Sequence, residues 1–97
     1  MNMRSYELMT IYNIELGESG AKGVSEEVKG MITSRGGEVV AEHFWGKRKF
    51  AYKVAGNEQG YYDVNEFDID PSQIAGLQRE LELHKDVVRY LVTSLEE

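Results

Sequence analysis

The stretch EVVAEHFWGKRKFAYKV, from Glu38 to Val54, decides the fold of this chain. Its alternation of apolar and polar residues predicts a long β-strand, but the apolar positions are odd in the first half and even in the second. The two sets are Val39, Ala41, His43 and Trp45, then Phe50, Tyr52 and Val54. Because the side chains of a strand alternate strictly between two faces, one extra residue near Gly46 would reconcile the halves, and we expect a β-bulge or a sharp bend there.

Three further segments have the alternation of strands. Residues 4–14 form the first of them, and residues 61–69 follow a predicted turn at residues 55–60. Residues 87–94 form the last, and they place three apolar residues on one face, namely Val88, Tyr90 and Val92.

Two helices lie between these strands. Residues 17–23 are rich in glycine and predict a loop, after which apolar residues recur at helical spacing until Gly36-Gly37 ends the helix. The step Asp70-Pro71-Ser72 opens the second helix. The apolar stripes of the two helices are Ala21, Val24, Val28, Met31 and Ile32, then Ile74, Leu77 and Leu81.

The resulting order is strand, helix, strand, strand, helix, strand. With both crossovers right-handed, this order predicts a ferredoxin-like α+β fold, in which two helices cover one face of a four-stranded antiparallel sheet. We expect one domain over residues 1–97, with the first and third strands central. The second face of the sheet would stay open to a ligand or a partner.

The charge of the chain is unevenly distributed. The net charge is −6, yet four of the eleven Lys and Arg residues lie within seven positions, and they are Lys47, Arg48, Lys49 and Lys53. Such a cluster on an acidic body predicts a small, local anion-binding surface, although a solvated edge strand would have the same composition. On the open face, the apolar residues Met9, Ile11 and Val64 favour contact with a protein partner over stacking with nucleic-acid bases.

No catalytic, metal-binding or cofactor-binding set can be assembled from the sequence. The chain has no cysteine, His43 and His84 are isolated, and we interpret Asp63 and the acidic residues after it as solvated charge. Thr10 and Asn65 should both face the helices, and we expect them to satisfy each other's hydrogen-bonding groups. The first residues lead directly into a strand pattern without an apolar signal segment, and we expect a cytoplasmic protein with no membrane contact and no small-molecule substrate.

These features resemble the family of ribosomal protein six of the bacterial small subunit across essentially the whole chain. The specific motif is Trp45-Gly46-Lys47-Arg48 followed by Phe50-Ala51-Tyr52. Supporting matches are Tyr6-Glu7, Gly37, the Gly60-Tyr61 step, Val87 and Arg89. The chain departs from the family in having Lys53 where Pro is common, and in ending at Glu96-Glu97 without the long acidic tail of some relatives.

The resemblance implies a non-enzymatic component of the small ribosomal subunit. Its implied partners are small-subunit ribosomal RNA and ribosomal protein eighteen, and the family's basic pair falls on Lys47 and Arg48. Arg and Lys in such a pair suit contact with RNA phosphates, and we extend this RNA-binding role to Lys49 and Lys53. An alternative from another class is a ferredoxin-like regulatory module that dimerises and binds a small molecule, and co-sedimentation with ribosomal particles would separate the two.

Overall fold

The computed structural model describes residues 2–54 and 56–96, with the side chains of residues 51–54 and 57 outside that description. The strands are β1 (Arg4–Asn13), β2 (Glu38–Val54), β3 (Asn57–Ile69) and β4 (Val87–Ser94). The helices are α1 (Gly17–Ser34) and α2 (Ile74–Leu83), each preceded by a 3₁₀ turn. Among these residues, neither helix is long and apolar enough to cross a membrane.

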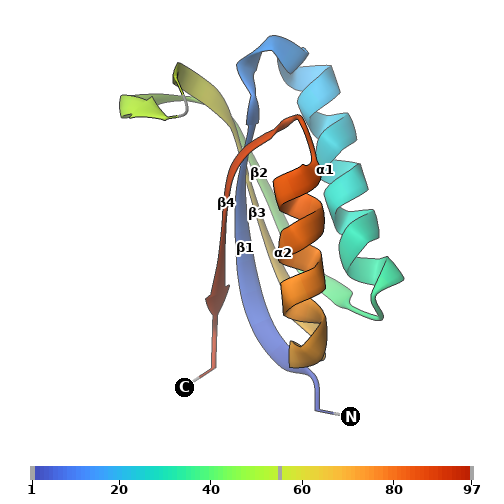
Figure 1. Ribbon diagram of the computed structural model, residues 1–97. Helices are drawn as coiled ribbons and strands as arrows, with labels where there is room; N and C mark the ends of the chain where they lie inside the picture. Colours follow the sequence, from blue (N-terminus) through green and yellow to red (C-terminus); the bar gives the residue numbers. More distant parts are fainter. Residues whose placement is uncertain (1, 55, 97) are drawn as a thin grey trace.

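The strands form one antiparallel sheet in the order β2-β3-β1-β4. Both helices cover the same face of this sheet and leave the other face open (Figure 1). The predicted ferredoxin-like arrangement is therefore confirmed, including the central position of the first and third strands.

The core lies between the sheet and the two helices. Its apolar side chains come from alternate positions of the central strands and from one stripe of each helix, as period-2 and period-3.6 patterns require. Fully buried members are Leu8, Tyr12, Phe67 and Ile69 from the sheet and Val28, Ile32, Leu77 and Leu81 from the helices.

The prediction of a loop at residues 17–23 was wrong, because α1 already begins at Gly17. Each glycine inside a helix costs up to about 1 kcal/mol relative to alanine, which is why the local sequence favours a loop. Packing outweighs this cost, since Ala21 and Val24 are buried and a Cβ at Gly20 would lie 3.1 Å from the Leu16 Cβ atom. The predicted end of the helix is confirmed, with Gly36 at a φ of 81°.

The start of β3 and the facing of residues in β4 also differ from expectation. β3 begins at Asn57 and not at Tyr61, so most of the predicted turn belongs to the strand. In β4, Ile11 pairs with Arg89 while Tyr12 pairs with Val87, which leaves Val88 as a bulged residue. Val87 therefore joins Tyr90 and Val92 against the core, in place of the predicted Val88.

Candidate functional site

The β2–β3 hairpin extends beyond the rest of the sheet. β1 ends at Asn13, which lies opposite Gly60, whereas β2 and β3 continue beyond it through the pairs Arg48–Gly60 and Lys49–Gln59 and, after an irregularity in β2, the pair Val54–Asn57. The outer part of the hairpin is thus a two-stranded ribbon, which projects from one end of the sheet (Figure 1). A projecting ribbon can enter a groove that the flat sheet cannot reach.

A β-bulge lies at the base of this ribbon, where the sequence predicted it. Phe44 pairs with Asp63 and Gly46 with Tyr62, so Trp45 is the extra residue. Gly46 has a φ of 83°, a left-handed conformation that residues with a Cβ adopt at a cost. The change of apolar phase inside β2 is therefore a real change of strand register.

The bulge sets the direction of the three consecutive cations. Lys47 pairs with Tyr61, whose side chain belongs to the core on the helix side, and Arg48 and Lys49 follow in alternation. Arg48 therefore lies on the open side of the ribbon, and Lys47 and Lys49 lie on the helix side. All three residues are exposed, and none has a carboxylate partner within the described part of the chain. The side chain of Lys53, the fourth predicted contact, lies outside the described residues.

The predicted partner-binding residues Met9, Ile11 and Val64 all lie on the open face. Two of them have little surface for a partner to contact, because only 3% of Ile11 and 8% of Val64 is accessible. Met9 is half-buried. Phe50 packs next to Ile11 above Gly60. A Cβ atom added at Gly60 would lie 2.8 Å from Ile11 Cγ2 and 3.2 Å from Phe50 Cζ, so both side chains cover this glycine. Ile11 and Val64 form the floor of an apolar surface, and other side chains form its exposed part.

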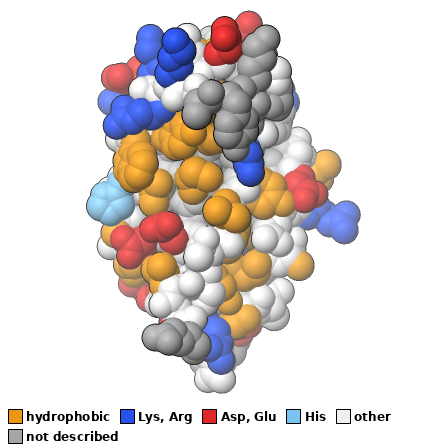
Figure 2. Space-filling view, turned by 90° about the vertical axis from the view of Figure 1, so that its left-hand side faces the viewer, with side chains coloured by type: hydrophobic (Ala, Val, Ile, Leu, Met, Phe, Trp, Pro, Cys, Tyr) orange, Lys and Arg blue, Asp and Glu red, His pale blue; other side chains and the backbone are white. Residues whose placement is uncertain are grey.

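Trp45 is the main exposed member of that apolar surface. Its ring stacks on Tyr62 with 6.5 Å between ring centroids and 11° between planes, and Phe50 packs against the same tyrosine at 5.8 Å. Trp45 keeps 52% of its surface accessible and Leu91 of β4 keeps 55%. Figure 2 shows apolar side chains along this face, with most of the visible basic side chains toward its upper end. Trp45 reaches the open face because it is the bulged residue of β2 and stacks on Tyr62 of that face.

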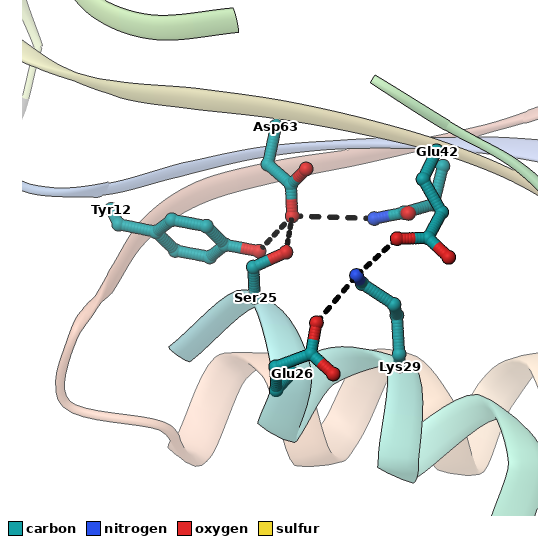
Figure 3. Close-up of polar contacts among 7 residues, drawn as sticks. Tyr12, Ser25, Glu26, Lys29, Glu42 and Asp63 are labelled. Atoms are coloured by element: carbon teal, nitrogen blue, oxygen red, sulfur yellow. Dashed lines mark hydrogen bonds and ion pairs between the residues drawn. The ribbon is translucent and has the colours of Figure 1, made fainter. Parts of the chain in front are cut away.

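Asp63 is buried, which corrects its interpretation as solvated charge. It is 1% accessible, and its Oδ2 atom accepts hydrogen bonds from Tyr12 Oη at 2.6 Å, Ser25 Oγ at 2.7 Å and Asn65 Nδ2 at 3.3 Å (Figure 3). Thr10 donates to Tyr12 Oη at 2.9 Å, so Thr10 and Asn65 are linked through this network and not to each other as expected. Asp63 shares the helix-facing side with Asn65, and its hydroxyl donor Ser25 lies on α1, a partner that strand alternation does not identify.

The two histidines each approach a carboxylate, although the sequence placed none near them. His84 Nε2 lies 3.0 Å from Glu27, and its Nδ1 accepts the Asp86 backbone N–H, so it joins α1 to the turn after α2. His43 lies 3.7 Å from Glu66 on the open face. Among the described residues, no group of three or more His, Asp or Glu side chains could hold a metal ion.

A ferredoxin-like domain with a cationic hairpin and a partly apolar open face has the features of a protein that binds other macromolecules. The sequence matches the family model described as Ribosomal protein S6 over residues 5–94. Small ribosomal subunit protein bS6 of Moorella thermoacetica is 38% identical to it over 95 residues, which span 98% of this chain and 97% of that protein. The same protein of Carboxydothermus hydrogenoformans is 40% identical over 90 residues, or 93% of this chain and 94% of the relative.

A solved structure agrees with these relatives. The crystal structure of 30S ribosomal protein S6 from Thermotoga maritima has a TM-score of 0.90 and 26% identity to this chain, covering 96% of it and 88% of that protein. The chain therefore belongs to the ribosomal protein S6 family. Membership confirms the prediction of a non-enzymatic protein of the bacterial small ribosomal subunit, located on the cytoplasmic ribosome.

Proposed function

We propose that this chain binds small-subunit ribosomal RNA jointly with ribosomal protein S18. The observation that carries the RNA part of this proposal is the exposure of Lys47, Arg48 and Lys49 on a ribbon that projects from the sheet. Without carboxylate partners in the described chain, these cations are available to phosphate groups. Arg48 can form a bidentate contact with one phosphate, whereas the lysines act as point charges.

The alternation of the cations favours phosphates on both sides of the ribbon. Arg48 lies on one face and Lys47 and Lys49 on the other. Contacts of this kind orient a protein on the RNA backbone and carry no direct information on base sequence. We therefore expect the hairpin to position the protein within folded RNA.

The rest of the molecule favours a protein partner. A body with seventeen acidic residues against eleven basic ones repels a polyanion at long range and attracts a basic protein. The open face supplies the exposed apolar side chains of Trp45 and Leu91 and the half-buried Met9, over the floor of Ile11 and Val64. Burial of such groups gives the specificity that scattered charges cannot give.

Filter binding of a small-subunit RNA fragment, with and without S18 and across a salt titration, tests this proposal. We expect weak binding by this chain alone and a clear gain in affinity when S18 is present. Tight, salt-resistant binding by the chain alone would contradict the joint model, and absence of binding in both arms would contradict the RNA-binding role itself.

A further inference from the structure

The open face of the sheet changes from apolar to acidic along the strands. On β3 the residues of this face are Tyr62, Val64, Glu66 and Asp68, in that order. Glu7 of β1 pairs with Glu66, and Glu38 of β2 pairs with Asp68. Figure 2 shows acidic side chains on this face beside the apolar ones.

The Glu7–Glu66 pair places two like charges opposite each other on the two central strands. Directly opposed like charges destabilise a sheet, so this arrangement costs free energy in the isolated protein. Both residues are half-buried, and 38% of the Glu66 side chain is accessible. Among the described residues, the imidazole of His43 lies 3.7 Å from Glu66, and neither Glu7 nor Glu66 has a Lys or Arg ion-pair partner. A cation supplied from outside would remove the repulsion.

The apolar half of the face provides the second contact. The Trp45 ring covers Tyr62, and both stand next to the buried Ile11 and Val64. Tyr62 and Glu66 are four residues apart on one strand, which corresponds to about 13 Å. A single extended segment along the strands can therefore reach both with side chains four residues apart, because such side chains lie on the same side.

We propose that this face binds an extended basic segment of the protein partner. One apolar side chain of the segment packs on Trp45 and Tyr62, and an Arg or Lys side chain lies between Glu7 and Glu66. This inference rests on the proposed function, which supplies the protein partner. The carboxylates decide between classes of partner, since they attract a cationic peptide and repel the phosphates of RNA.

The test compares two double variants with the same change in charge. Glu7→Gln with Glu66→Gln removes the open-face pair, and Glu18→Gln with Glu26→Gln removes two exposed carboxylates from α1, in the helix layer. Binding of S18 is measured by titration calorimetry at low and moderate salt. We expect the first variant to bind about tenfold more weakly, with a reduced dependence on salt, and the control to change less than about twofold. Urea unfolding should show that the first variant is at least as stable as the parent, because a like-charge pair is lost.

Each result has a distinct meaning. If the parent protein itself does not bind S18, the proposed function fails. If the parent binds and both double variants bind as well as it does, the proposed function stands and this inference is overturned. The inference is also overturned if the open-face variant binds the RNA fragment more tightly than the control variant does while its affinity for S18 is unchanged, since the face would then belong to RNA.

Discussion

The hydroxyl of Tyr12 donates a 2.6 Å hydrogen bond to the carboxylate of Asp63 between the sheet and α1. Tyr12 lies on β1 and Asp63 on β3, and Ser25 of α1 donates to the same oxygen. The two hydrogen bonds to Asp63 thus connect both central strands and α1 at one point (Figure 3). A carboxylate buried to 1% accessibility depends on such donors, because an unsatisfied buried charge is costly.

We expect Tyr12→Phe to lower the free energy of unfolding by about 1–3 kcal/mol, since it removes one donor and leaves the buried acceptor in place. A matched control is Tyr90→Phe, because Tyr90 also donates a 2.6 Å bond to a carboxylate, that of Glu82, but at the surface. Urea unfolding should show a loss below about 1 kcal/mol for the control. Equal losses in the two variants would mean that burial of the network adds nothing to its strength.

We expect the protein to lose stability at high pH because of Tyr12. Burial, together with the nearby Asp63 carboxylate, raises the pKa of Tyr12 far above its usual value of about 10. The unfolded chain therefore releases this proton at a lower pH than the folded one, so the contribution is fully present below about pH 10 and is lost as the pH rises above it. Above that pH, the difference in proton binding at Tyr12 should lower the free energy of unfolding by about 1.4 kcal/mol for each pH unit. Denaturation from pH 9 to 11 should be less pH-dependent in Tyr12→Phe, and identical slopes would contradict the assignment.

The glycines of α1 offer a test of its early start. A Cβ at Gly23 would meet no atom within 4 Å, and Gly23 lies inside the helix. Gly23→Ala should therefore stabilise the protein by about 0.5–1 kcal/mol. Gly60→Ala is the contrasting variant, because its Cβ would lie 2.9 Å from the Tyr12 carbonyl oxygen, and it should cost about 1–3 kcal/mol. Thermal unfolding checks both, and a destabilised Gly23→Ala protein would show that residues 17–23 are not helical in solution.

Gly76 and Arg35 should be energetically coupled. Arg35, directly after α1, forms an ion pair of 2.7 Å with Glu80 of α2, and a Cβ at Gly76 would clash with its Nη1 atom. Gly76→Ala must displace the guanidinium, so the gain in helix propensity is offset by the weakened ion pair, and we expect a net change below about 1 kcal/mol. In the Arg35→Ala background the same substitution should stabilise by about 1 kcal/mol. A double-mutant cycle by urea unfolding measures this difference, and strict additivity would rule out the coupling.

The sequence was most informative where local periodicity carries the signal. The change of phase across Gly46 predicted a bulge because alternation on a strand cannot switch faces without an extra residue. The direction of Trp45 did not follow, since the side chain of the extra residue depends on the geometry of the bulge. For α1, glycine propensity pointed to a loop, and the packing of Ala21 and Val24 against the sheet overrides it.

The buried network was missed although part of its signal was present. Asn65 was placed on the helix-facing side, and Asp63, two residues earlier on the same strand, shares that side. Ser25, which donates a hydrogen bond to Asp63, is 38 residues away in sequence. The sequence pattern does not show which turn of α1 lies over Asp63. Contacts between elements distant in sequence are set by packing, and no local pattern encodes them.

The hairpin cations should control the salt dependence of RNA binding. The double variant Lys47→Ala with Arg48→Ala removes one cation from each face of the ribbon, and both residues are exposed, so the fold should be unaffected. Each lost phosphate contact lowers the slope of log affinity against log salt concentration by about one, because fewer counterions are released. Filter binding to the S18–RNA complex from low to moderate salt measures this slope. The control is Arg79→Ala with Lys85→Ala, which makes the same charge change at exposed positions of α2 and the turn after it. If the two double variants lower the slope equally, net charge governs the binding, and the cations of the hairpin act as a solvated edge without a dedicated role in RNA contact.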